Sequence, residues 1–142
     1  MSQAILEENK ALIKQLMTEV DRGNLGIIDE SYSDDYVDNT PSPIRGLAKG
    51  KAGIIKAAEI FKASFPDTKH VIHQLIAEDD RVTLHMSAEG THTGELFGVQ
   101  PTGKKVTLTG ISIYVIKDGK ISERWAYHGV GVLDQLGIEI PK

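Results

Sequence analysis

The hydrophobic residues of this chain change their spacing once, near residue 66, and no other feature of the sequence constrains the fold as much. Between Ala4 and Val20 the apolar residues recur every three or four positions, which predicts a helix with one buried stripe. Lys51 to Ser64 has the same spacing, and Pro66 ends it. After Pro66 the period becomes two, in segments rich in β-branched residues, which predicts strands. The predicted strands cover residues 70–78, 81–92, 104–116 and 120–127.

The order of these elements predicts an α+β fold. A short second helix is expected over 25–32, an extended piece running into a loop over 34–43, and a last helical turn over 132–136. Tight hairpin turns are expected at 78–80 and 117–120, the second with an Asp-Gly pair. Helices followed by an antiparallel meander of about four strands are typical of the α+β class. We expect one domain, residues 1–142, whose sheet curls around the helices and encloses a cavity.

The composition argues against several classes of function. The formal net charge is −4 and no block of Lys or Arg stands out, which argues against a nucleic-acid partner. The first 17 residues carry acidic side chains and have neither the basic start nor the apolar run of a signal peptide. No segment approaches the ~18 continuous apolar residues of a membrane span. We expect a cytoplasmic protein that does not bind membranes.

Metal and nucleophile motifs are not found either. There is no cysteine, and His70 and His73 are three residues apart on a predicted strand, so their side chains point to opposite faces. Neither H-x-H nor H-E-x-x-H spacing occurs, and no G-x-S-x-G motif is present. The Gly-rich segment 94–98 lacks the Lys-Ser/Thr ending of a phosphate loop. These patterns predict no metal site.

Four groups of segments, spread over nearly the whole chain and in the right order, resemble one family. They are 9–36; 77–82; 90–95 with 97–98 and 101–104; and 119–125 with 133–137. Together they are similar to the SnoaL-like polyketide cyclases of the nuclear transport factor 2-like superfamily. The resemblance implies a cone-shaped α+β barrel, a pocket for a small apolar or polyketide-like molecule without metal or cofactor, and a homodimer through the outer face of the sheet.

The resemblance also implies a reaction, the intramolecular aldol closure of a polyketide ester. In these cyclases an aspartate a few residues after the tryptophan that matches Trp125 serves as acid and base. Counted forward from Trp125, that position falls on Gly129, and counted back from the segment 133–137 it falls on His128. In addition, Asn39 stands where many relatives carry histidine. We therefore keep three hypotheses. The chain is a cyclase or isomerase, a non-catalytic module that binds a small apolar molecule, or a dimeric scaffold with a filled interior.

His128 is the candidate catalytic residue. An aldol closure needs a base for a proton already acidified by carbonyl groups, and the imidazole has an ordinary pKa of roughly 6.5. The alternative is a partly exposed histidine at a strand end. Further candidates for substrate binding carry a polar tip on an apolar body, which suits a pocket lining and a core equally well. They are Tyr36, Asn39, Tyr114 and Trp125.

Three more residues complete the candidate site. His85 shares a strand face with Thr83 and Ser87, and this face points either into the cavity or to a dimer partner. Phe97 is expected to act as an apolar lid over the cavity. Asp38 belongs to an acidic run that is typical of a solvated surface, but it is also a possible inward-pointing substitute for the aspartate of the family.

Overall fold

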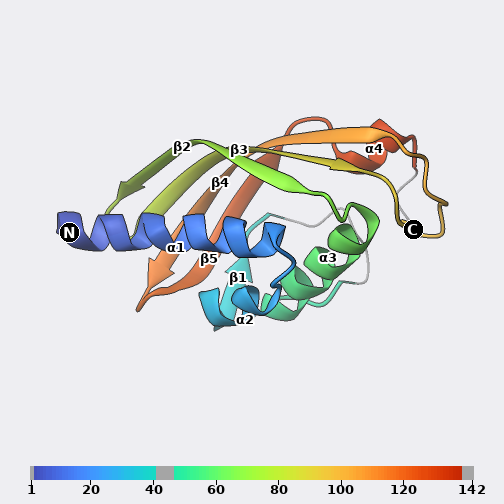
Figure 1. Cartoon of the computed structure of the whole chain (residues 1–142). Coiled ribbons are helices and arrows are strands. Elements are labelled where there is room, and N and C mark those ends of the chain that lie inside the picture. The colour runs from blue at the N-terminus through green and yellow to red at the C-terminus, as the bar shows by residue number, and fades with distance from the viewer. Residues whose placement is uncertain (1, 41–46, 139–142) are drawn as a thin grey trace.

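The computed structural model describes residues 2–40 and 47–138, and Figure 1 shows the arrangement of the elements. None of the helices in these residues is long and apolar enough to cross a membrane. The helices are α1 (Gln3–Asp21), α2 (Gly26–Ser31), α3 (Lys51–Ser64) and α4 (Val132–Leu136). The strands are β1 (Tyr32–Asp38), β2 (Lys69–Glu78), β3 (Arg81–Thr91), β4 (Lys105–Lys117) and β5 (Lys120–His128).

The strands form one sheet in the order β1-β5-β4-β3-β2. The four predicted strands are present and pair antiparallel in sequence order, and the predicted helical turn at 132–136 is α4. The described residues form five strands, one more than the sequence predicted. The segment interpreted as an extended piece contributes β1, which pairs parallel with β5 through Tyr32 opposite Ile121 and Asp38 opposite Arg124. The last part of that piece, residues 41–43, lies outside the described residues.

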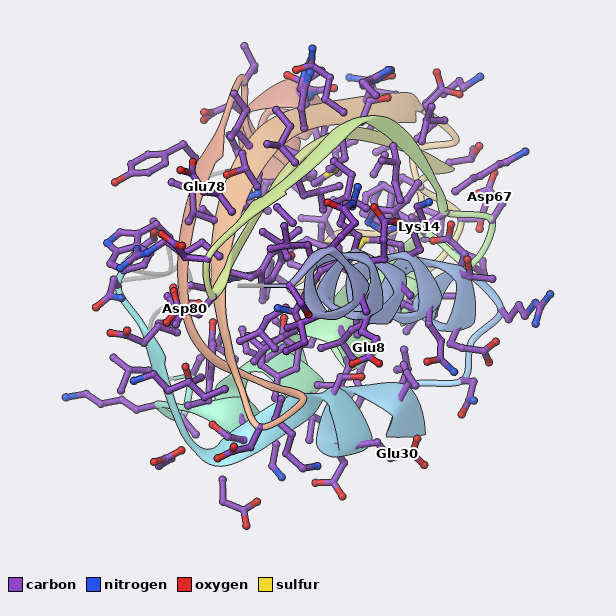
Figure 2. The ribbon with its side chains drawn as sticks, turned by 90° about the vertical axis from the view of Figure 1, so that its left-hand side faces the viewer. Glu8, Lys14, Glu30, Asp67, Glu78 and Asp80 are labelled. Carbon is purple, nitrogen blue, oxygen red and sulfur yellow. The ribbon has the colours of Figure 1, made fainter. Side chains whose placement is uncertain are left out.

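The main core lies between α1 and the concave face of the sheet. Figure 2 looks along α1 and shows the strands curving around it, while labelled charged side chains such as Glu30 and Asp67 lie at the periphery. Ile13 and Leu16 of α1 pack in one cluster with Val82 and Leu84 of β3, and all four side chains are almost completely buried. Each contributes about 1.5–3 kcal/mol to folding. The alternation of period two in β3 thus selects the face that wraps the helix.

One β-bulge decides which side chains of β5 reach this concave face. Val115 pairs with Glu123, but the next residue of β4, Ile116, pairs with Ile121, so Ser122 is an extra residue in β5. Its hydroxyl donates a hydrogen bond to the carbonyl of Val115 at 3.2 Å. Without the extra residue, Ile121 and Arg124 would point to opposite faces, because they are three positions apart. The bulge therefore turns the partly buried Arg124 toward the interior.

A second, smaller cluster lies beneath the segment that joins β3 to β4. Its members come from the end of α3, from that connection, from β4 and from α4, and all are buried: Phe65, Leu96, Val106, Leu133 and Leu136. Phe97 packs against this cluster and has a positive φ of 48°. The connection is thus held by its own apolar contacts.

Candidate functional site

The inner faces of β1, β4 and β5 bring a group of polar residues together. Asp38 of β1 and Tyr114 of β4 both pair across strands with Arg124 of β5, so Arg124 lies between them. Further along β4 and β5, Gly110 of β4 pairs with His128, the last residue of β5. Because Arg124 and His128 are four positions apart on a strand, both point to the same side of the sheet.

Asp38 is the centre of a hydrogen-bond network. Its Oδ2 accepts from Nη2 of Arg124 at 2.7 Å and from the hydroxyl of Tyr36 at 3.0 Å. Its Oδ1 accepts from the backbone N–H of Thr40 at 3.0 Å. The carboxylate and the guanidinium side chains are only 21% and 23% exposed. A half-buried carboxylate with three donors is strongly held in place, because hydrogen bonds to charged groups are about twice as strong as neutral ones.

Three tyrosines surround this ion pair. Tyr32, Tyr36 and Tyr114 are each about 3% exposed, and the rings of Tyr32 and Tyr36 meet edge to face at 4.7 Å. Burial raises the pKa of all three hydroxyls, and the charge of Arg124 only partly opposes this. Burial alone lowers the pKa of Arg124, but the tyrosines and Asp38 raise it above its ordinary value. The tyrosines therefore stay protonated and Arg124 stays charged.

His128 lies beside this network at the end of β5. A Cβ atom on Gly110 would come within 2.8 Å of Cδ2 of His128, so the bare glycine is what leaves room for the ring. The side chain is open to solvent on one side, but the surrounding protein partly desolvates the ring. This desolvation lowers the pKa of His128, the positive charge of Arg124 lowers it further, and Asp38 raises it. The imidazole is therefore neutral near pH 7 and able to accept a proton.

The structure brings together only some of the residues that the sequence singled out. Tyr36 and Tyr114 lie with His128 on the inner side of the sheet. Asn39 directs its side chain to solvent, and its backbone N–H donates to the carbonyl of Arg124 at 2.8 Å. Phe97 packs on the second cluster and not on the tyrosines.

His85 and Trp125 lie on the opposite face of the sheet. His85 alternates with buried Leu84 and Met86, and its ring is 5.1 Å from that of His73 on the neighbouring strand. Trp125 follows Arg124 directly and stacks on the guanidinium of Arg81, whose Cζ is 5.4 Å from the ring centre. Strand alternation turns both side chains away from Tyr114 and His128, so their positions do not support the expected role in lining an interior cavity.

The sequence interpretation missed Arg124 and Tyr32. Tyr32 begins the strand that was not recognised, and Arg124 reaches the interior only because of the bulge at Ser122. Asp38, which was considered as an inward-pointing carboxylate, is held in the interior by Arg124 and Tyr36. The available signal was an acidic residue at the end of β1 and a basic residue in the middle of β5.

Potential metal ligands are dispersed. Within residues 2–40 and 47–138, no three His, Asp or Glu side chains come close enough together to hold a metal ion. His70 contacts Asp21 at the end of α1, with 2.5 Å between Nδ1 and Oδ1, whereas His73 contacts Ser87 on the outer face at 2.9 Å. The two histidines thus lie on opposite faces of β2, as their spacing predicts.

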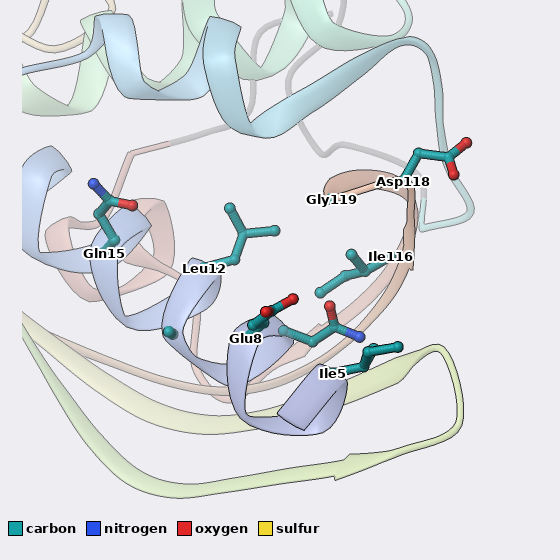
Figure 3. Close-up of a pocket in the computed structure, with 9 residues that line it drawn as sticks. Ile5, Glu8, Leu12, Gln15, Ile116, Asp118 and Gly119 are labelled. Carbon is teal, nitrogen blue, oxygen red and sulfur yellow. The ribbon is translucent and has the colours of Figure 1, made fainter. Parts of the chain in front are cut away.

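A groove of about 630 Å³ lies elsewhere, between the N-terminal half of α1 and the β4–β5 hairpin (Figure 3). Apolar side chains of Ile5, Leu12 and Ile116 line it, together with Asn9 and the backbone at Gly119. The hairpin is at the opposite end of β5 from His128, roughly 30 Å away at the usual rise of a strand. This open groove is therefore separate from the residues around Arg124, and the expected interior cavity stays a prediction.

Comparison with known proteins gives the family. The model of the SnoaL-like polyketide cyclases matches residues 11–136. The chain belongs to this family. Among curated proteins, none is significantly similar to it in sequence. As a member of the SnoaL-like family, the chain has its expected α+β architecture, with helices on a strongly curved sheet.

Several solved structures of related proteins share this fold over nearly their full length. AclR from Streptomyces galilaeus, a proposed hydroxylase, is 31% identical with a TM-score of 0.80, and the match covers 93% of this chain and 97% of AclR. IdmH from Streptomyces antibioticus, a proposed polyketide cyclase, is 28% identical with a TM-score of 0.76, covering 92% and 99%. A proposed polyketide cyclase from Bacillus cereus is 27% identical with a TM-score of 0.81, covering 99% and 87%.

Proposed function

We propose that this SnoaL-like protein binds a small, apolar, polyketide-like ester and catalyses its intramolecular aldol closure, or a related isomerisation, without a metal or cofactor. The observation that carries the proposal is the position of His128, a base with a lowered pKa beside the partly buried Arg124–Asp38 pair. IdmH, a proposed polyketide cyclase that covers 92% of this chain, supports the same class of reaction.

The reaction needs one base and one group that stabilises negative charge. His128 removes a proton from a carbon between two carbonyl groups, and the resulting enolate attacks a ketone carbon of the same molecule. A carbon–carbon bond forms, the π bond of the ketone breaks, and its oxygen takes the proton back from the imidazolium. Asp38 is less suited to be the base, because its carboxylate already accepts three hydrogen bonds. Substrate and product have the same atoms.

A non-catalytic binding module is the second candidate. It is favoured by the sequence at the family position, where His128 or Gly129 replaces the acid–base carboxylate. In that case a polyketide-like ligand would raise the melting temperature of the protein and be recovered unchanged. Under either function, a cytoplasmic location stays a prediction.

Turnover of an aromatic polyketide ester by the wild type and two histidine variants distinguishes these functions. We expect His128→Ala to lower kcat/KM by roughly 10²- to 10⁴-fold, the usual contribution of a general base, and to change Tm by no more than about 2 °C. His73→Ala, an exposed histidine on the outer face, is the matched control and should keep full activity. Full activity of His128→Ala would refute the role of His128.

Mass spectrometry of the same reactions identifies the chemistry. A cyclised product has the mass of the substrate, whereas a gain of one oxygen atom would indicate the activity proposed for AclR. Binding of the ester by the wild type without any product would favour the binding module.

We also propose that the partner is a second copy of the chain, bound through the outer face of the sheet. This face exposes large apolar side chains, and Ile76, Ile111 and Tyr127 are 59%, 48% and 63% exposed. Sedimentation should give a dimer for the wild type and a monomer for Ile111→Glu, because a buried unpaired charge is strongly unfavourable. A monomeric wild type would contradict this assembly.

A further inference from the structure

Within the described residues, the interior network leaves one hydrogen-bond donor of Arg124 unused. Its one carboxylate, Asp38, already accepts from Arg124, Tyr36 and Thr40. The guanidinium has five N–H donors: Nη2 donates to Asp38, and the hydroxyls of Tyr32 and Tyr114 also interact with the guanidinium. Among the described residues, its Nε–H is buried without a partner. A buried donor without an acceptor is unfavourable, so the Nε–H of Arg124 still calls for an acceptor among the residues that the structure describes.

Two tyrosine hydroxyls lie beside this guanidinium, and each can both accept and donate a hydrogen bond. Tyr32 and Tyr114 are close enough to Arg124 for its charge to act on their ionisation, and both hydroxyls keep their protons because burial raises their pKa. Tyr114 also interacts with Ser112, whose hydroxyl both donates and accepts. Arg124, Tyr32 and Tyr114 come from three neighbouring strands, β5, β1 and β4, which fixes their mutual positions.

We propose that Arg124, Tyr32 and Tyr114 form a binding site for an anionic oxygen of the ligand, such as an enolate, phenolate or carboxylate oxygen on an apolar ring. The guanidinium supplies a charge that is always present, and the two hydroxyls supply neutral donors whose strands are fixed in the sheet. The inference rests on the proposed function for the apolar part of the ligand, and it names the polar group that this ligand must carry.

This site would also select the reactive form of a substrate. When His128 removes a proton from an enolisable compound, the negative charge moves onto a carbonyl oxygen. Donors that are already in position stabilise that oxygen more than the neutral carbonyl, which is how such sites accelerate a reaction. Asp38 and Tyr36 then act as positioning residues that hold the guanidinium.

The experiment compares two probes that differ only in charge, 2-naphthoate and its methyl ester. Calorimetry at neutral pH should show that the wild type binds the carboxylate at least about tenfold more tightly than the ester. Tyr114→Phe removes one donor with little change in volume and should weaken carboxylate binding by about tenfold, because a hydrogen bond to a charged group is lost, while ester binding stays the same. Tyr32→Phe should act in the same direction.

The matched control is Thr18→Ala, which removes a hydroxyl from the exposed side of α1 and should change neither affinity. Equal affinity of the wild type for the two probes, or no binding of either, would overturn the inference. So would an equal loss of both affinities in Tyr114→Phe and Tyr32→Phe, which would indicate a structural role. The binding experiment does not depend on turnover. A protein that binds the carboxylate more tightly than the ester but cyclises no ester in the turnover assay would therefore refute the proposed function without refuting this site.

Discussion

Asp38 and Arg124 can be replaced singly and together to measure how strongly they are coupled. Asp38→Ala leaves the guanidinium without its carboxylate and removes the acceptor of Tyr36 and Thr40 as well. We expect this variant to lose about 3 kcal/mol of unfolding free energy, at the lower end of the range for breaking a buried ion pair, because both side chains are about one-fifth exposed. Arg124→Met should lose about 2 kcal/mol, because Asp38 keeps two of its donors.

The double variant should lose less than the sum of the single losses. With both charges gone, no unpaired ion remains in the interior, so we expect a loss of about 3.5 kcal/mol and a coupling of about 1.5 kcal/mol. A domain of this size loses about 3 °C in Tm for each kcal/mol, so Asp38→Ala should melt about 9 °C below the wild type.

Urea unfolding gives these free energies. The fluorescence of Trp125, the one tryptophan of the chain, reports on the strand that carries Arg124. Single losses that add within about 0.5 kcal/mol would show that the two side chains are not coupled, and the network described above would then be wrong.

Two further substitutions test the surroundings of the site. Gly110→Ala should displace the ring of His128, because its Cβ would lie 2.8 Å from Cδ2 of His128 and 3.1 Å from the carbonyl of Tyr127. Turnover should fall at least about tenfold, whereas Gly26→Ala, where the nearest atom is 3.6 Å away, should stay active; full activity of Gly110→Ala would contradict the placement of the ring. His92→Ala should lower the unfolding free energy by about 3 kcal/mol, because His92 is completely buried, accepts from the N–H of Thr102 at 3.2 Å and packs on Phe65. Thermal unfolding measures this loss, and a decrease in unfolding free energy below about 1 kcal/mol would mean that His92 does not hold the β3–β4 connection.

Hydrophobic periodicity was sufficient to predict most of the fold. The helical stripe of α1 and the alternation in β3 are local properties, so spacing alone placed Ile13 in a buried stripe and Val82 and Leu84 together on one strand face, and the structure shows all three in the core. Strand β1 could not be recognised in this way, because its burial does not alternate regularly and its partner β5 lies some 85 residues further along the chain. Its pairing depends on tertiary contacts that a local pattern does not contain.

The candidate site was less predictable for the same reason. His128 and Tyr114 were singled out because imidazole and phenol groups have recognisable chemistry, but the spacing of β5 places Trp125 and Arg124 on opposite faces without saying which face is inside. The bulge at Ser122 decides this, and it turns Arg124 inward and Trp125 outward. The connection that holds Phe97 likewise depends on a second cluster contributed by α3, β4 and α4.

Titration of the His128 imidazole by NMR is the most direct test of the account, because the proposed chemistry depends on a neutral base next to Arg124. In the folded protein we predict a pKa below the ordinary value of about 6.5, lowered by desolvation and by the charge of Arg124. In the same protein unfolded by urea, the pKa of His128 should return to its ordinary value. A folded-state pKa at or above about 6.5 would contradict the account, because His128 would then lie outside the influence of the interior network.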